Sequence, residues 1–300
     1  MRAIAGAALI ALTALAGPGA PAHAAMPASP LTAAFSPAAA DELFGISCVS
    51  PRACVAVGLN QNALSRRGGP LAEKWNGKAW KYVAMRLPAG AISGELFGVS
   101  CRSAVACVAV GLYLDSSDTG IPLAETWNGR AWRPSRLPAP AGSTGVILDG
   151  VSCTSPESCV AVGSGTPGSG RPGRTGFAER WNGSRWTGVS VSWPRGTGNS
   201  YLVGVSCAAR NCVAVGYSGV SVTAASGTGR ATAVSWQGKA WTVTKVPAPG
   251  RGKASLFSDV SCLSAANCVA AGQVGPAGST EGIGLTGFWT GKAWRLVTAL

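Results

Sequence analysis

Histidine is almost absent from this chain of 300 residues, and the single one, His23, lies in a segment that we expect to be removed. Residues 1–24 have the parts of a signal peptide: Arg2 as a positive start, the apolar run AIAGAALIALTALAG, and Ala22-His23-Ala24 as the cleavage site. A chain without His23 has no Ser-His-Asp or Cys-His catalytic centre and no metal site with a histidine ligand. We therefore expect a protein with no metal and no other cofactor.

A second long apolar run is also lacking. The run within residues 1–24 is shorter than a membrane span and is followed by Pro18 and Pro21, and no later stretch approaches the length of a span. No cysteine follows the cleavage site directly, which argues against a lipid anchor. These absences predict a secreted, extracellular protein without a membrane span, whose mature chain starts at Ala25.

Acidic residues are scarce: 12 Asp and Glu stand against 25 Lys and Arg, and the loss of Arg2 lowers the formal net charge of +13 by only one. A basic exported protein meets anionic partners such as wall polymers, acidic polysaccharide or nucleic acid. Generic solubility is the competing explanation of the same charge. We expect an anionic extracellular polymer or glycan as the partner, with another surface protein as the alternative, and we do not expect nucleic acid.

What the chain does contain is a repeat built on five cysteine pairs. The first cysteines of successive pairs lie 53, 52, 54 and 55 residues apart, and each pair leads into CVAVG or CVAAG. An even number of cysteines in an exported chain usually forms disulfides. Zinc needs four ligands, whereas each pair offers two thiols, and the spacing is not that of a C-x-x-C redox centre. The predicted disulfides are Cys48–Cys54, Cys101–Cys107, Cys153–Cys159, Cys207–Cys212 and Cys262–Cys268.

Each unit also contains a second phrase, found as EKWNGKAW, ETWNGRAW, ERWNGSRW, VSWQGKAW and GFWTGKAW. The NG pair is typical of a two-residue hairpin, because both central residues of a type I′ turn need a positive φ. Four strands per unit, named A to D, predict an all-β, five-bladed β-propeller with four antiparallel strands in each blade. A solenoid is the alternative, although its repeats are usually shorter. The predicted blades are 41–92, 93–144, 145–198, 199–253 and 254–300, preceded by an N-terminal segment, 25–40.

The order of an A strand, a B strand ending in glycine, a C strand, a short turn and a D strand opened by tryptophan resembles kelch-type repeats. The propeller of galactose oxidase belongs to that class, and the likeness extends as a pattern over the whole mature chain. Kelch repeats carry a Gly-Gly doublet after strand B, whereas single glycines such as Gly58 and Gly111 stand here. The resemblance implies the fold and not the activity, since copper oxidase chemistry needs histidine ligands.

Ten of the 11 tryptophans form pairs, such as Trp75 and Trp80, on either side of the turn between strands C and D. An even loop places the two rings on the same face of the sheet as cross-strand neighbours. Packing between blades is the expected role, and a row of sugar-stacking surfaces is the alternative. Glu73, Glu125 and Glu179 lie two positions before the first tryptophan of their units, and we expect them to be solvated or paired with lysine.

The B–C and D–A loops are expected at one end of the propeller, and loops on a rigid scaffold often carry binding residues. The cationic and aromatic residues of these loops are the predicted ligand-binding residues: Arg66, Arg67, Tyr113, Arg171, Arg174, Trp193, Arg195, Tyr201, Tyr217, Arg230, Arg251 and Lys253. A pair of carboxyl groups near the channel mouth would be enough for sugar hydrolysis without histidine. The acidic residues placed for this role near the start of strand A are Glu42, Glu95, Asp149 and Asp259.

Three functions are compatible with these residues. The first is a non-catalytic module whose loops bind an anionic polymer or a cell-wall glycan, the second is a glycoside hydrolase or lyase, and the third is a structural or protein-contacting wall component. The missing histidine and nucleophile motif favour the first. We also predict weak ring closure, because unit one starts with its own A strand and unit five ends with its own D strand. Met26–Phe35 fall where an additional strand would join.

Overall fold

The computed structural model describes residues 39–62, 68–135, 137–140, 142–168, 173–220, 229–236, 238–279 and 281–298. Within these ranges every regular element is a β-strand, so no helix there could cross a membrane. The described residues belong to the unit Pro37–Leu300, the second of the two units into which the chain divides. The predicted signal peptide and Met26–Phe35 lie outside the described residues. The all-β prediction is confirmed for the described part of the chain.

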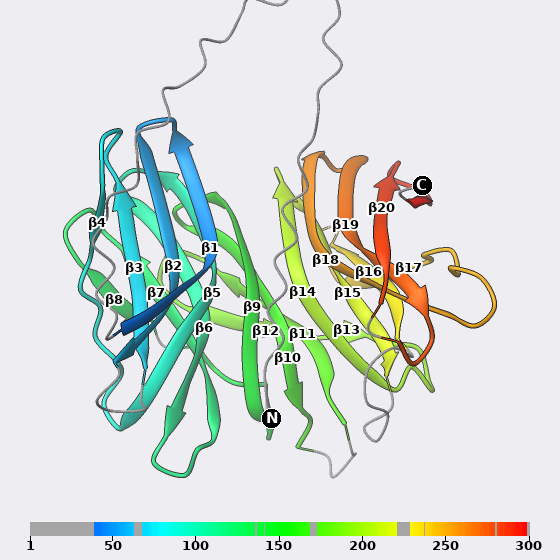
Figure 1. Ribbon diagram of the computed structural model, residues 1–300, viewed down its shortest axis with the longest axis horizontal. Coiled ribbons are helices and arrows are strands. Elements are labelled where there is room, and N and C mark those ends of the chain that lie inside the picture. Colours follow the sequence, from blue (N-terminus) through cyan, green and yellow to red (C-terminus); the bar gives the residue numbers. More distant parts are fainter. Residues whose placement is uncertain are drawn as a thin grey trace, which may run out of the picture. The chain divides into compact units, whose positions relative to one another are not determined.

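Each repeat forms one sheet whose antiparallel strands follow the order of the chain, coloured from blue to red in Figure 1. Sheet 1 contains β1 (Ala39–Ser50), β2 (Ala53–Asn62), β3 (Gly69–Trp75) and β4 (Trp80–Tyr82). Sheet 2 contains β5 (Ala91–Ser103), β6 (Ala106–Asp115), β7 (Gly120–Trp127) and β8 (Trp132–Ser135). Sheet 3 contains β9 (Thr144–Ser155), β10 (Ser158–Thr166), β11 (Thr175–Trp181) and β12 (Trp186–Val189).

The last two repeats follow the same order, with one addition. Sheet 4 contains β14 (Asn199–Ala208), β15 (Asn211–Val220), β16 (Arg230–Trp236) and β17 (Trp241–Thr244). Sheet 5 contains β18 (Lys253–Ser264), β19 (Asn267–Pro276), β20 (Ile283–Trp289) and β21 (Trp294–Thr298). β1 and β5 start slightly ahead of the predicted blade starts at 41 and 93.

Sheet 4 contains the predicted four antiparallel strands and also a fifth strand that the sequence did not predict. β13 (Val191–Ser192) lies in the connection from sheet 3 and pairs in parallel with β17, Val191 opposite Trp241. The outer edge of β17 leaves backbone groups that a neighbouring segment can pair with. Val191 is buried in the core between sheets 3 and 4, which adds an apolar contribution to this pairing.

All five predicted disulfides are present, and no free cysteine occurs among the described residues. Each disulfide joins directly opposite residues of strands A and B, as Cys101 and Cys107 do with Cα atoms 4.0 Å apart. A few residues before its cysteine, strand A has a β-bulge, which in sheet 2 lies between Leu96 and Gly98. This bulge explains the single glycine of strand B, since a Cβ on Gly111 would collide with the carbonyl oxygen of Glu95.

Among the described residues, the core consists of four apolar layers, each between two successive sheets. The earlier sheet contributes its valine face, which we define by the two strand-B valines and the strand-C alanine, such as Val55, Val57 and Ala72. The later sheet contributes its disulfide face, which we define by the disulfide, the strand-A leucine or phenylalanine and the tryptophan pair. The predicted packing of tryptophans between sheets is confirmed for sheets 2 to 5, where Trp132, for example, is 5% exposed, and not for Trp80 of sheet 1, which is 38% exposed.

The expectation of solvated glutamates is wrong for Glu125 and Glu179. Both side chains have no exposed surface, and their carboxyl oxygens have no hydrogen-bond partner among the described residues. They lie on disulfide faces because Glu125 is two positions from Trp127 on one strand and therefore points the same way. The sequence showed their polarity but not that a preceding sheet covers that face.

Candidate functional site

The most elaborate polar cluster on the predicted loop end is built around Arg174, at the start of β11. Its Nη2 donates to the carbonyl oxygens of Gly145 at 2.8 Å and Ser164 at 2.9 Å. Its Nε donates to the Ser164 hydroxyl at 3.2 Å, and its backbone N–H donates to the Asn199 side-chain oxygen at 2.8 Å. Arg174 thereby joins the loop end of sheet 3 to the start of sheet 4.

The contacts of the guanidinium leave one of its nitrogens for a ligand. Arginine has five N–H donors, and the three side-chain contacts engage Nε and Nη2. Within the described ranges, Nη1 has no acceptor, and the Arg174 side chain is half-buried. The free Nη1 retains two N–H donors, so this fixed guanidinium can donate charge-assisted hydrogen bonds from one nitrogen to a carboxylate, sulfate or phosphate group.

Two tyrosines of sheet 4 lie beside this guanidinium. The rings of Tyr201 and Tyr217 stack with centroids 4.7 Å apart and an interplanar angle of 22°. They are direct cross-strand partners on β14 and β15, which explains the stacking. The guanidinium carbon of Arg174 lies 6.0 Å from the centroid of the Tyr201 ring. The pair offers a flat aromatic surface next to a fixed positive charge.

Asp149 completes the cluster from the bulge of β9. Burial raises the pKa of Asp149 to about 7, and the positive charge of Arg174 opposes this shift. Burial also raises the pKa of Tyr217 to about 12, with further contributions from Tyr201 and from Asp149, so the tyrosine stays neutral. We call Asp149, Arg174, Tyr201 and Tyr217, with Ser164, the Arg174 cluster.

The other predicted acidic residues do not join this cluster. Glu95 on β5 is half-buried, and burial together with the charge of Glu42 on β1 raises its pKa. Asp259 is exposed and stands where the other units have the glycine of the GVSC phrase, and its carboxylate accepts the backbone N–H of Val260 at 2.8 Å. Glu42 and Glu95 occupy the same position in their repeats, opposite Leu59 and Leu112, whereas Asp149 and Asp259 lie closer to the first cysteine of their units. Among these four residues, charge coupling links Glu95 with Glu42.

The remaining predicted binding residues fall into three groups. Arg195, Arg230, Arg251 and Lys253 are exposed. Tyr113 and Trp193 are half-buried and pack on the inter-sheet cores, and the Trp193 indole N–H donates to the Gly176 carbonyl oxygen at 2.8 Å. Arg66, Arg67 and Arg171 lie outside the described residues. The sequence missed Ser164 and Asn199, because nothing in their local sequence shows that they hold Arg174.

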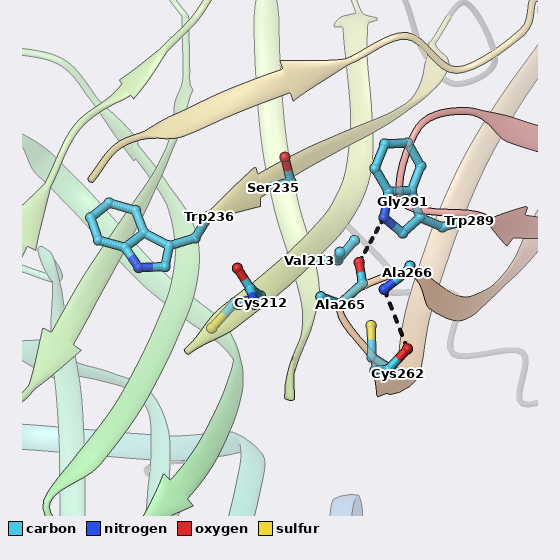
Figure 2. A pocket seen from close by; sticks show the side chains of 11 residues that line it. Cys212, Val213, Ser235, Trp236, Cys262, Ala265, Ala266, Trp289 and Gly291 are labelled. Carbon is cyan, nitrogen blue, oxygen red and sulfur yellow. Dashed lines mark hydrogen bonds between the residues drawn. The ribbon is translucent and has the colours of Figure 1, made fainter. Parts of the chain in front are cut away.

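Grooves at the opposite end of the sheets form a second candidate. Three of them, of about 210, 630 and 260 Å³, lie between successive sheets, next to the disulfides and first tryptophans. Figure 2 shows the groove between sheets 4 and 5, with Trp236 on one side and Trp289 on the other. The indole N–H of Trp289 is occupied by the Ala265 carbonyl oxygen at 3.1 Å, and both rings are buried. These rings offer little surface for stacking on a ligand.

No family model and no curated protein matches the chain. Among solved structures, the SapL1 lectin in complex with alpha methyl fucoside matches with a TM-score of 0.50 and 11% identity, over 87% of this chain and 80% of that chain. A protein of unknown function from Dyadobacter fermentans also has a TM-score of 0.50, with 10% identity over 88% of both chains. The lectin is a β-propeller protein, so this similarity supports a propeller fold for the five sheets; at these identities it shows the fold alone.

Proposed function

We propose that this chain is a non-catalytic, extracellular β-propeller module that binds an anionic polymer or cell-wall glycan at the end bearing its B–C and D–A loops. The observation that carries the proposal is the Arg174 cluster. A guanidinium fixed by three hydrogen bonds lies beside a stacked tyrosine pair, where one part of a ligand can pair with charge and another can stack.

Further cations extend the site for a long ligand. These exposed cations are Arg195 in the connection to β14, Arg230 at the start of β16 opposite Ser218 of β15, Arg251 just before β18, and Lys253 at its start. A flexible polyanion held by several such contacts binds through long-range charge, and affinity therefore falls steeply with ionic strength. The structurally similar SapL1 lectin is in complex with alpha methyl fucoside, and this supports a polymer built of sugar units.

A second candidate, a glycoside hydrolase or lyase, is favoured by one observation. A carboxyl group with a pKa of about 7, as in Asp149, can donate a proton near neutral pH. Glu95, whose pKa is also raised, is the other carboxyl that we name for this reaction, although the structure couples it with Glu42 and not with Asp149. Release of sugar products by the mature protein, abolished by Glu95→Gln or Asp149→Asn, would establish the enzyme and overturn the binding module.

Retention on immobilised acidic polysaccharide tests the binding proposal. We expect the triple change of Arg171, Arg174 and Arg195 to glutamine to lower the salt concentration needed for elution. The matched control changes Lys78, Arg130 and Lys239, exposed cations on the C–D turns, to glutamine. Equal losses from both triple variants would mean diffuse charge without a site. An Arg174→Lys variant, checked for an unchanged thermal midpoint, separates loss of the fixed guanidinium geometry from loss of folding.

A further inference from the structure

The two terminal sheets each leave one face without the partner that this face has elsewhere. Sheets 2 to 5 cover their disulfide faces with the preceding sheet, and sheets 1 to 4 cover their valine faces with the following sheet. The repeat therefore has four internal junctions of one kind. The disulfide face of sheet 1 and the valine face of sheet 5 are the two halves of a fifth junction.

Exposure shows that the disulfide face of sheet 1 is open. Leu43 is 49% and Ile46 62% exposed, whereas their counterparts in sheet 2, Leu96 and Val99, are 0% and 8% exposed. Trp80 is also exposed, although the second tryptophan of every other unit is buried. Apolar residues gathered on one surface in this way mark an interaction site.

The valine face of sheet 5 is also more exposed than the corresponding face of sheet 4. Val269 is 40% exposed, whereas Val213 at the same position of sheet 4 is 4% exposed. Ala271 is exposed and Thr286 half-buried, at positions that are fully buried in sheet 4 as Val215 and Ala233. The residue types are those of an inter-sheet core, but the covering sheet is missing.

Within the part of the chain that the structure describes, a hydrogen bond that recurs at each internal junction is also missing between the open faces of sheets 1 and 5. At each internal junction, the serine before the first cysteine accepts the backbone N–H of the first cysteine of the next sheet, at 2.9–3.0 Å. The acceptors are Ser47, Ser100, Ser152 and Ser206. Across the described ranges, no such bond links Ser261 of sheet 5 with the N–H of Cys48 in sheet 1. One acceptor and one donor of the repeated bond are thus left over, one on each open face.

Aromatic residues make the two open faces complementary. Lys74 on the valine face of sheet 1 lies with Nζ 4.4 Å from the Trp127 ring centroid of sheet 2. The position of Lys74 is occupied in sheet 5 by Phe288, and the guanidinium carbon of Arg295 lies 5.3 Å from its ring centroid. Docking of the fifth junction brings Phe288 against Trp75, which has the position of Trp127. An aromatic pair backed by a cation then replaces the internal cation–aromatic contact.

We propose that these faces bind each other between two copies of this chain, with the valine face of sheet 5 in one copy on the disulfide face of sheet 1 in the next. The interface is continuous with four junctions already built from the same residues. Because the two surfaces differ, association is head-to-tail, and each copy keeps one face for a further copy. The protein partner that we assign to these two open faces is therefore a second copy of the same chain.

Asp259 favours a second copy over closure within one chain. At the internal junctions, the glycine at its position lies against the next sheet so closely that a Cβ on Gly45 would be 2.7 Å from the Phe97 carbonyl oxygen, and one on Gly98 3.0 Å from that of Asp149. Asp259 brings a Cβ and a carboxylate to this contact. A separate copy can shift and tilt to fit the larger side chain, whereas sheets within one chain are held by four junctions of fixed spacing.

Sedimentation velocity of the mature protein and two surface variants tests the proposal. Ile46→Arg blocks the disulfide face of sheet 1, and Val269→Arg blocks the valine face of sheet 5; both side chains are exposed, so neither change opens a cavity. We expect the unmodified protein to gain mass with concentration and each variant alone to stay monomeric. An equal mixture of the variants must form a one-to-one dimer, because each retains the face that the other has lost. Val105→Arg, an exposed turn residue outside both faces, is the control and must still associate.

Three results would overturn this proposal. An unmodified protein that stays monomeric at every concentration, together with a lower thermal midpoint for Ile46→Arg, would mean that the chain closes on itself. A monomer that associates only after deletion of Ala25–Ala38 would assign the open faces to the N-terminal segment. Variants that associate as strongly as the unmodified protein would mean a contact elsewhere on the surface.

Discussion

The hydroxyl oxygen of Ser100 in sheet 2 accepts a hydrogen bond from the backbone N–H of Cys153 in sheet 3, 3.0 Å away. A buried or half-buried hydrogen bond of this kind contributes about 1 kcal/mol to folding stability. We therefore expect Ser100→Ala to lower the free energy of unfolding by about that amount, measured by urea denaturation. Ser261→Ala is the matched control, since Ser261 has no equivalent bond in the described chain. An equal loss from both variants, measured at low protein concentration, would contradict the assigned role.

The disulfides are expected to stabilise their own hairpins independently. Loss of Cys101–Cys107, in a Cys101→Ala, Cys107→Ala double variant, removes a short closed loop and costs roughly 2 kcal/mol on the chain-entropy model. The same double change at Cys207 and Cys212 should cost a similar amount, and the two losses should add, because the hairpins share no partner residues. Losses that combine far more than additively would show that the two hairpins are energetically coupled, which would contradict independent stabilisation. Urea denaturation of the three variants measures this.

Glu125 and Glu179 predict an unusual dependence of stability on pH. Burial raises the pKa of both carboxyl groups to about 8, from an ordinary value near 4.5. Between these values the folded chain keeps protons that the unfolded chain has released, so stability falls as pH rises. Each group contributes a slope of up to about 1.4 kcal/mol per pH unit.

Glutamine variants test this pH dependence. Glu125→Gln and Glu179→Gln cannot ionise, and we expect the midpoint of urea unfolding to become less sensitive to pH between 5 and 8 as a result, by the linkage of protons to folding. Glu157→Gln, an exposed glutamate of the A–B turn in sheet 3, should leave the pH profile unchanged. A profile that is flat in the unmodified protein would mean that the two carboxyl groups reach water.

The local part of the fold was predictable from sequence, because its causes are local. Cys101 and Cys107 lie on either side of a short turn, and the asparagine-glycine pair at Asn128 and Gly129 marks the place of the next hairpin. The predicted type I′ turn with two residues of positive φ is wrong: four residues separate Trp127 from Trp132, and only Gly129 has a positive φ, of +90°. The Asn128 side-chain oxygen instead accepts the backbone N–H groups of Arg130 and Ala131. Features that depend on a neighbouring sheet were not predictable. β13 pairs with a strand about fifty residues further on, and Glu125 is buried only because sheet 1 covers it.

The candidate site was predictable only in its residue types. Arg174, Tyr201 and Tyr217 were selected as loop cations and aromatics, but the sequence gives no distance between residues of different repeats. The hydrogen bonds to Gly145 and Ser164 that hold Arg174 come from two other segments of sheet 3. Of the cations predicted from sequence, the structure therefore fixes Arg174 in a defined cluster, whereas Arg195, Arg230, Arg251 and Lys253 stay exposed.

The charge state of Asp149 predicts how binding depends on pH. With a pKa of about 7, Asp149 is largely neutral at pH 6 and ionised at pH 8, where its carboxylate competes with an anionic ligand for Arg174. We therefore expect retention on acidic polysaccharide to weaken as pH rises from 6 to 8 at constant salt. Asp149→Asn removes the charge and should keep retention strong across this range. The control variant Asp118→Asn also replaces one carboxyl group by an amide, but at an exposed turn residue, and it should behave like the unmodified protein. If Asp149→Asn and the unmodified protein showed the same pH profile, the ligand would lie away from the Arg174 cluster.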